Sequence, residues 1–236
     1  MNSLQTITID NVSCVKSHYG VYLRTKWTDA TFHFCCLGRY GNAFSDYLDG
    51  LDAEFSFIDI GANQGLYSLI AARNPHCTSV IAFEPVASSF EYLLDNLRIN
   101  QAHAKVQAIN AAVSDTAGMA EIAIKPGHSG AASLRSTKPV WLSSAETIKT
   151  VNVEQLNSVF AGAINCVIKI DVEGHELTVI QELMHSGVLA RSDAIYYEVN
   201  EDWVEVEHIQ KLLTSCGFSH FQPIGAGAHY DILATK

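Results

Sequence analysis

The sequence predicts an α/β protein, a three-layer α-β-α sandwich around a mostly parallel, seven-stranded sheet. From Phe55 onward, short apolar runs alternate with segments of helical periodicity, and this alternation is typical of a parallel sheet. Most of the runs are almost continuously apolar, so helices have to cover both of their faces. Only residues 225–228 separate the last two runs, which predicts an antiparallel hairpin at the C-terminal end.

The strands and helices are expected in a regular order along the chain. The expected strands are FSFIDIG, SVIAFEP, KVQAINAAV, NCVIKIDV, AIYYEVN, FSHFQPI and HYDILATK. Helices are expected at residues 66–73, 88–100, 175–186 and 205–216. Residues 125–146 are rich in Gly, Ser, Ala and Pro, and they predict a long irregular connection that interrupts the series.

The residues before the α/β series follow a different pattern. Residues 5–37 alternate polar and apolar around Gly20, which predicts two or three antiparallel strands, one of them in ATFHFCCL. A helix is expected from Asn42 to Leu51. We therefore divide the chain into a β-rich N-terminal extension with a helix, residues 1–50, and a core, residues 51–236.

Composition indicates a soluble globular protein. A chain of 236 residues with 48% hydrophobic and 17% charged residues suits one α/β domain with a short addition. The net charge of −10, without a run of Lys and Arg, argues against a nucleic-acid partner. No window reaches about 18 consecutive apolar residues, and the first residues lack a basic start followed by an apolar run, so we expect a cytoplasmic protein without a membrane partner.

The six cysteines predict neither a zinc site nor a redox motif. They stand at positions 14, 35, 36, 77, 166 and 216, without Cys-x-x-Cys spacing. We expect buried, reduced thiols. Cys35 and Cys36 are expected in one strand, and therefore on opposite faces of it.

The loop after the first strand of the series has the features of a nucleotide-type cofactor site. Gly61 and Gly65 lie at a strand-to-helix junction, where backbone N–H groups and a helix N-terminus face a ligand. The Gly-x-x-x-Gly spacing lacks the second and third glycines of a dinucleotide fingerprint, which disfavours pyrophosphate binding. Asp59 and Asn63 offer acceptor groups that suit the ammonium group of an amino-acid moiety.

Glu84 ends the second strand, nineteen positions after Gly65. A carboxylate about twenty residues after such a loop is expected to bind ribose hydroxyls, so an adenosyl amino acid fits both signals. The alternative is that the glycines are turn residues and that Glu84-Pro85 is a solvated strand end. The predicted cofactor-binding set is Asp59, Gly61, Asn63, Gly65, Glu84, Pro85, Ala112 and Asp171.

Four segments resemble the FkbM-type methyltransferases. They are FIDIGANQGLYSLIAA, AFEPVASSFEYLLDNL, NAAVSDTAG and IKIDVEGHELTVIQEL, and the motif from Lys169 to Glu176 is the most specific. The resemblance spans roughly residues 55–200. It implies a Rossmann-like class I methyltransferase fold, S-adenosyl-L-methionine as methyl donor, and transfer usually to oxygen on sugars, polyketides or other natural products.

Methyl transfer to a hydroxyl group calls for a base, since the acceptor loses its proton near the transition state. Asp171 is our first candidate because ligands lie beyond the carboxyl ends of parallel strands, and its alternative role is to cap the next helix. His175 can titrate near neutrality, although a surface or supporting histidine is the plainer interpretation. Glu198 ends the fifth strand and is expected to line the acceptor pocket with Asn200 and Trp203. The catalytic candidates are thus Asp171, Glu198 and His175.

Other residues near Asp171 have expected roles as well. Lys169 lies on the same strand face as Asp171, so an ion pair is plausible. Glu176 is expected to be structural at the start of a helix. Residues 130–134 are candidates for a segment that closes over the acceptor. We predict no metal site, although Asp171, Glu173, His175 and Glu198 carry ligand atoms that Mg²⁺ accepts.

The sequence thus predicts an S-adenosyl-L-methionine-dependent O-methyltransferase whose partner is a hydroxylated small molecule. A homodimer is an open alternative to a monomer. A nicotinamide-dependent oxidoreductase on the same type of sheet is the first rival, and the missing fingerprint glycines disfavour it. The other rivals are a non-catalytic cofactor-binding protein and a methyltransferase that acts on nitrogen.

Overall fold

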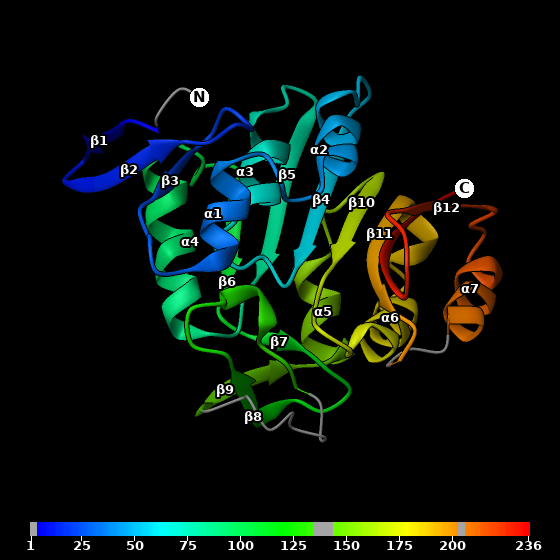
Figure 1. Ribbon diagram of the computed structural model, residues 1–236. Coiled ribbons are helices and arrows are strands. Elements are labelled where there is room, and N and C mark those ends of the chain that lie inside the picture. Colours follow the sequence, from blue (N-terminus) through cyan, green and yellow to red (C-terminus); the bar gives the residue numbers. More distant parts are fainter. Residues whose placement is uncertain (1–3, 135–143, 203–205) are drawn as a thin grey trace.

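A seven-stranded sheet in the order β12-β13-β11-β10-β4-β5-β6 forms the centre of the computed structural model, which describes residues 4–134, 144–202 and 206–236 (Figure 1). Its strands are β4 Phe55–Ile60, β5 Cys77–Phe83, β6 Val106–Ile109, β10 Cys166–Ile170, β11 Ser192–Asn200, β12 His220–Ile224 and β13 His229–Thr235. The pairs β11–β13 and β12–β13 are antiparallel, and the other neighbours are parallel. The predicted mostly parallel sheet and its C-terminal hairpin are confirmed.

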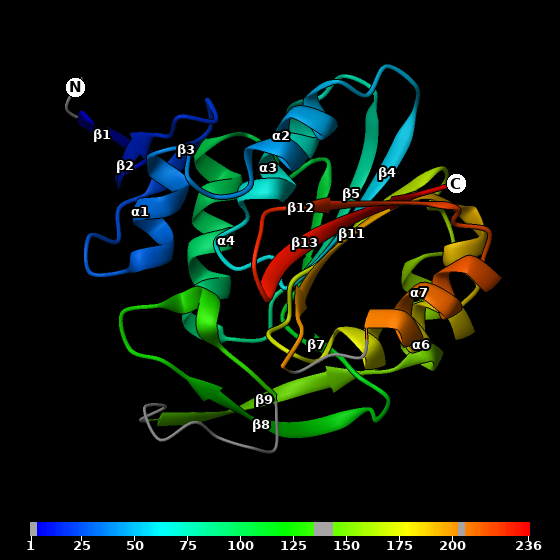
Figure 2. The same ribbon diagram turned by 45° about the vertical axis from the view of Figure 1, so that its right-hand side comes forward.

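Helices cover both faces of this sheet (Figure 2). Helices α2 Asn42–Asp49, α3 Leu66–Arg73 and α4 Ala87–Ile99 pack on one face, where Phe44, Leu69 and Leu93 belong to one core cluster. Helices α5 Val153–Val159, α6 Glu176–His185 and α7 Val206–Ser215 pack on the other face, above a second core cluster. The predicted three-layer sandwich is therefore confirmed. The first and last residues of each predicted helix differ by at most two positions from those of an observed helix.

Successive residues of each central strand contribute to different layers. Phe57 and Val167 belong to the cluster under α3, whereas Ile58 and Ile168 belong to the opposite cluster. The next residue of each strand returns to the α3 side, and Asp59 is directly paired there with Lys169 of β10. The polar pair of Asp59 and Lys169 therefore lies on the α3 face, close to the carboxyl ends of β4 and β10.

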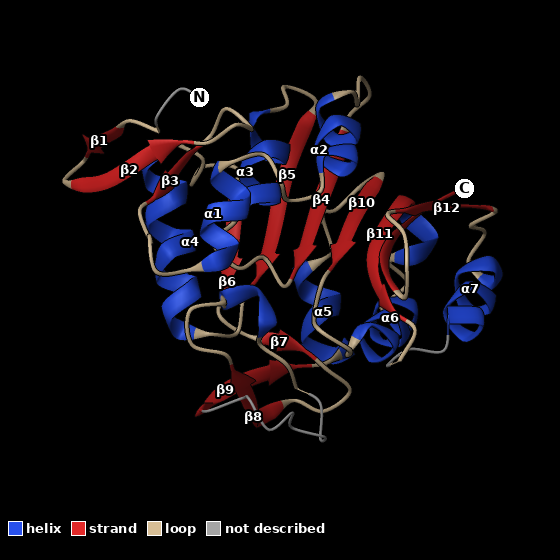
Figure 3. Cartoon of the chain, viewed as in Figure 1, coloured by secondary structure: helices blue, strands red, loops and turns tan. Residues whose placement is uncertain are grey.

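The N-terminal residues form a small antiparallel sheet, as predicted, with β1 Thr6–Ile9, β2 Val12–Lys16 and β3 Tyr22–Arg24 (upper left in Figure 3). This sheet is joined to α4, since the Arg24 N–H donates to the Asn96 side chain at 2.6 Å. Leu23 and Phe32 also lie in the core cluster under α3. The division of the chain at residue 50 stays a prediction.

The strand that we predicted in ATFHFCCL is wrong, because these residues form helix α1 Ala30–Cys36. The Asp29 side chain caps this helix by accepting the Phe32 N–H at 3.0 Å. Phe32, Cys35 and Cys36 are all buried, at the helical spacings of three and four residues. Cys35 and Cys36 therefore do not lie on opposite faces of a strand. All six cysteines are free, as expected, but only five are buried, since Cys216 is half-buried.

A second small sheet, missed by the sequence analysis, lies below the central sheet in Figure 1. It consists of β7 Ala112–Val113, β8 Gly118–Ile124 and β9 Ser144–Val151, in the order β7-β9-β8. Residues 125–134 are irregular apart from a 3-10 turn, η1 Ser129–Ala131, whereas residues 144–146 of the predicted irregular connection belong to β9. The expected strand KVQAINAAV is divided between β6 and β7.

Two shorter elements complete the described chain. Helix α5 was also missed, and it begins with a capping box in which Asn152 and Gln155 each bond the other's backbone N–H. A second 3-10 turn, η2 Leu189–Arg191, leads into β11. Over residues 4–134, 144–202 and 206–236, no helix has the length and apolar character that crossing a membrane requires.

Candidate active site

Two cavities open at the carboxyl edge of the central sheet. The first, the loop cavity, lies beside Gly61, Asn63 and Glu84. The second, the carboxylate cavity, has a volume of about 250 Å³ and is lined by Asp171, Glu173, Glu198 and Asp231 among others. Both cavities are lined by Tyr40, Gly130, Asp171 and Glu173. The cavities therefore meet around Asp171.

Most of the predicted cofactor-binding residues border the loop cavity. Those that line it are Gly61, Asn63, Glu84, Pro85, Ala112 and Asp171. Phe83, Val113 and Ile122 add apolar surface to the same lining. The cavity thus combines an apolar wall with a few polar groups, among them the buried Glu84 carboxylate, which is the composition expected of a small-molecule pocket.

The β4–α3 loop approaches the strand β10 end very closely. Gly61 has a φ of 79°, and its carbonyl oxygen accepts a hydrogen bond from Lys169 Nζ at 2.6 Å. A Cβ atom at residue 61 would overlap the carbonyl oxygen of Asp171. Gly65 also has a positive φ, and a Cβ atom there would overlap a methyl group of Leu93. The absence of a side chain at Gly61 therefore lets the loop lie against the end of β10, whereas its absence at Gly65 lets α3 pack on α4.

We expect Gly61→Ala to lower the free energy of unfolding by about 2–5 kcal/mol, because it adds backbone strain to a collision with a fixed carbonyl group. Urea denaturation measures this loss. Gly187→Ala is the matched control, since Gly187 has a φ of 71° but nothing within 4 Å of the added Cβ. The control reports the backbone strain alone, about 1–2 kcal/mol. Equal losses in the two variants would contradict the close approach at Gly61.

Glu84 is a buried carboxylate whose oxygens are oriented by the backbone. Its Oε2 accepts the Asn63 N–H at 2.8 Å, and its Oε1 accepts the Val86 N–H at 2.9 Å. Only 5% of the residue is exposed, and burial raises the pKa of Glu84 to about 7 against the opposing effect of these hydrogen bonds. Each oxygen keeps acceptor capacity for a ligand hydroxyl group.

Asn63 links the β4–α3 loop to η1. It has a φ of 51°, and its side-chain Oδ1 accepts a hydrogen bond from Ser129 Oγ at 3.0 Å. Ser129 Oγ also lies 3.1 Å from the Asp29 carboxylate. The segment from Gly130 to Leu134, which we expected to close over the acceptor, lines the loop cavity through Gly130, Ala132 and Leu134.

Asp59 and Lys169 form a buried charged pair behind the loop. Asp59 has no exposed surface, accepts a hydrogen bond from Ser68 Oγ at 2.7 Å and lies 3.4 Å from Lys169 Nζ. Burial alone would lower the pKa of Lys169, but the nearby carboxylates of Asp171 and Asp59 outweigh it and raise that pKa. Asp59 does not line the loop cavity, so it is placed to support the loop through Lys169.

The Asp171 carboxylate has two partners at one of its oxygens. Oδ2 accepts a hydrogen bond from the Tyr40 hydroxyl at 2.9 Å and lies 3.5 Å from Lys169 Nζ. The ion pair expected between Lys169 and Asp171 is confirmed. The N-cap residue of α6 is His175, so Asp171 does not take the alternative role of capping that helix.

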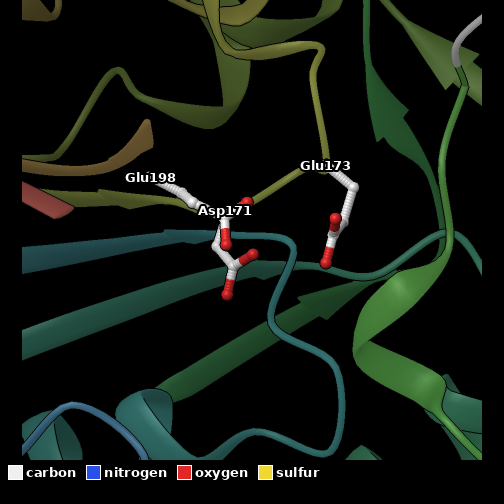
Figure 4. Close-up of side chains that lie close together, drawn as sticks. All are labelled: Asp171, Glu173 and Glu198. Atoms are coloured by element: carbon white, nitrogen blue, oxygen red, sulfur yellow. The ribbon is translucent and has the colours of Figure 1, made fainter. Parts of the chain in front are cut away.

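Three carboxylates converge in the carboxylate cavity (Figure 4). Asp171 and Glu173 follow β10 and Glu198 comes from β11, and each offers an oxygen within 4.8 Å of the others. Burial and the neighbouring carboxylates hold the pKa of Glu198 well above its usual range. His229 Nε2 lies 2.6 Å from Glu198 Oε1. Such oxygens are of the kind that Mg²⁺ accepts, and our expectation of no metal site stays a prediction.

The remaining candidates take different positions. His175 lines the loop cavity with Nε2 3.1 Å from Ser114 Oγ, and burial lowers its pKa. Glu176 Oε1 accepts the N–H groups of Val172 and Gly174, in keeping with a structural role. Asn200 lines neither cavity, and Trp203 lies outside the described residues.

Sequence reasoning missed several residues of the site. Tyr40 carries no local signal, because only the fold brings it to Asp171, 131 positions away. His229 and Asp231 were within reach of prediction, since an antiparallel last strand begins at the edge where its parallel neighbours end. Asp231 is directly paired with Glu198 in that ladder.

This strand order, a mostly parallel seven-stranded sheet that ends in an antiparallel hairpin, is that of the Rossmann-like methyltransferase fold. Residues 59–219 match the model of the methyltransferase FkbM domain, and the chain belongs to this family. The family resemblance seen in the sequence is therefore confirmed. A putative transferase from Pyrococcus horikoshii has the same fold, with a TM-score of 0.50 and 12% identity over 96% of this chain and 71% of that chain.

Two curated relatives are methyltransferases. The chain is 29% identical over 175 residues to the methyltransferase sdnD of Sordaria araneosa, a match that covers 71% of this chain and 66% of sdnD. It is 28% identical over 163 residues to the hexuronic acid methyltransferase AglP of Haloferax volcanii, with 68% and 62% covered. The chain thus spans slightly less than two thirds of the length of either relative.

Proposed function

We propose that this protein transfers a methyl group from S-adenosyl-L-methionine to a hydroxyl oxygen of a sugar or natural-product-type small molecule. One observation carries the proposal. A carboxylate, Asp171, lines both the loop cavity, which holds Glu84 and apolar side chains, and the carboxylate cavity, which holds Glu198 and Asp231. Family membership and two methyltransferase relatives support the reaction class.

The loop cavity fits the methyl donor in its donor and acceptor groups. Glu84 offers two carboxylate oxygens that the backbone already orients, which suits the paired hydroxyls of a ribose. The apolar wall of Phe83, Val113 and Ile122 suits a base. We assign contact with the donor to Gly61, Asn63, Glu84, Pro85, Ala112 and Asp171. Asp59 and Gly65 support the loop from behind.

When bound, S-adenosyl-L-methionine supplies a methyl carbon that bonds to the acceptor oxygen as its bond to sulfur breaks, with the electron pair staying on sulfur. The protein has to hold the acceptor in line and take up one proton. Asp171 Oδ2 is occupied by Tyr40 and Lys169, so we assign the acceptor proton to Oδ1. Glu198 and His175 border this region as supporting groups.

The acceptor class follows from the charges in the carboxylate cavity. Asp171, Glu173, Glu198 and Asp231 face Arg39 and the two histidines His128 and His229. The chain as a whole carries a net charge of −10. An uncharged polyhydroxy acceptor is therefore favoured over a phosphorylated one, since like charges slow encounter.

The affinity for the methyl donor is expected to rise about tenfold between pH 6 and pH 8. The pKa of Glu84 is raised from 4.5 to about 7, so this carboxyl is mostly protonated at pH 6 and ionised at pH 8. The ionised form is the better acceptor for ribose hydroxyls, and binding should release a proton near neutrality. Isothermal titration at four pH values measures the trend, and an affinity that is flat or falls with pH would contradict it.

The test of the function is transfer of a radiolabelled methyl group to a panel of acceptors. The panel holds methyl glycosides of a neutral hexose, a hexuronic acid and an amino hexose, followed by mass spectrometry of any labelled product. We expect ether formation on the neutral glycoside. A panel with no labelled product, in the presence of measured donor binding, would overturn the assignment of sugar hydroxyls as acceptors.

A further inference from the structure

Tyr40 enters the site from a part of the chain outside the matched family segment, residues 59–219. It lies between α1 and α2 and lines both the loop cavity and the carboxylate cavity. Its hydroxyl donates to Asp171 Oδ2 at 2.9 Å. Burial, and then the adjacent Asp171 charge, raise the pKa of Tyr40 well above its ordinary value, so the hydroxyl keeps its proton and remains a donor.

The backbone of Tyr40 is fixed by side chains on both sides. Its N–H donates to the Tyr19 hydroxyl at 2.8 Å, and its carbonyl oxygen accepts hydrogen bonds from the hydroxyls of Tyr19 at 2.7 Å and Tyr67 at 3.1 Å. Tyr19 is in turn tied to α3, because its carbonyl oxygen accepts a hydrogen bond from Arg73. Tyr40 is therefore held in register with the β4–α3 unit that carries the loop.

A hydrogen bond and an ion pair hold one oxygen of the same carboxylate. Lys169 approaches Oδ2 from within the sheet, and Tyr40 approaches it from the N-terminal segment. The terminal torsion of an Asp side chain is broad, so without such partners the carboxylate would sample a range of orientations. With Oδ2 held, Oδ1 has a defined direction.

We propose that Tyr40 is a positioning residue for methyl transfer, which holds the Asp171 carboxylate so that its other oxygen receives the proton of the acceptor hydroxyl. The inference rests on the proposed function, since it takes Asp171 as the base. It also assigns the N-terminal segment a part in catalysis. The Tyr40 hydroxyl comes from outside the matched family segment, residues 59–219.

Tyr40→Phe removes the hydroxyl and keeps the ring. We expect kcat for the neutral glycoside to fall about tenfold or more, while KM for the methyl donor changes little and the melting temperature falls by only a few degrees. In a Tyr40→Phe, Asp171→Asn double variant the losses should not add, because the tyrosine acts through the carboxylate. Tyr47→Phe is the matched control, since Tyr47 belongs to neighbouring helix α2 and is absent from the linings of both cavities.

The outcomes separate this inference from the proposed function. If Asp171→Asn lowers kcat and Tyr40→Phe does not, the positioning role is overturned and the function stands. If neither variant lowers kcat, Asp171 is not the base, and the inference fails with it. A urea-unfolding double-mutant cycle needs no glycoside, and it pairs Tyr40→Phe with Asp171→Ala, which removes the acceptor of the tyrosine hydroxyl. We expect a coupling of about tenfold in the unfolding constant between the two positions, and no coupling would overturn the contact itself.

Discussion

Asp171→Asn is expected to lower kcat by about 10²- to 10⁴-fold, the loss typical of removing a positioned base. The amide has the same shape, and its oxygen can still accept from Tyr40, but it loses the ion pair with Lys169 and cannot take up a proton at neutral pH. Binding of the methyl donor should weaken much less than kcat falls, since the amide keeps the shape of the side chain and one acceptor oxygen beside the loop cavity. Stopped assays with labelled donor, together with titration of the demethylated product, measure the two effects separately.

Asp193→Asn serves as the control for this change. Asp193 is an exposed residue near the first residue of β11, at the opposite edge of the sheet from the cavities. The kcat of Asp193→Asn should stay within about twofold of that of the wild-type protein, as for other surface substitutions. A wild-type rate in Asp171→Asn would contradict the assignment of the base and direct attention to the pair formed by His229 and Glu198, 2.6 Å apart.

Glu84→Ala is expected to weaken binding of S-adenosyl-L-methionine by about 10²-fold or more, since each hydrogen bond to a charged group contributes roughly 1.5–3 kcal/mol. The substitution also leaves the N–H groups of Asn63 and Val86 without their acceptor. An unpaired buried donor costs about 1–3 kcal/mol, so the free energy of unfolding should fall as well. Isothermal titration gives the affinity and urea denaturation gives the stability.

Two further variants test whether the loss of binding comes from removing the Glu84 carboxylate itself. Glu84→Gln keeps one acceptor oxygen and should bind with intermediate affinity. Glu91→Ala removes an exposed carboxylate from α4 without touching the loop, and it should bind as wild type does. If Glu84→Ala binds the donor normally while remaining folded, the loop cavity is not the cofactor site.

The α/β core could be predicted because its signal is local. Runs such as Phe55–Ile60 are buried at every position, and a continuous apolar run followed by an amphipathic segment has few other interpretations. The second small sheet could not be predicted as readily, since β8 and β9 are partly exposed and their side chains alternate irregularly. The N-terminal segment was misread at α1, where aromatic and β-branched residues imitate a strand and only the Asp29 cap signals a helix.

The site was predictable at strand ends and not beyond them. Glu84 and Asp171 could be expected to lie close together, and they do line one cavity, because the carboxyl ends of parallel strands share one edge. Asp59 was expected to face a ligand, but it alternates with Ile60 and so points under α3, where Lys169 meets it. Tyr40 depends on a contact across 131 positions that no local pattern encodes.

The most direct test of the central claim is isothermal titration of the wild-type protein with S-adenosyl-L-methionine, its demethylated product and NADH. We expect saturable one-to-one binding of the first two and none of NADH, with binding lost in Glu84→Ala and in Gly61→Val. Binding of NADH alone, or of none of the three ligands by the folded protein, would contradict the assignment of this chain's loop cavity to the methyl donor.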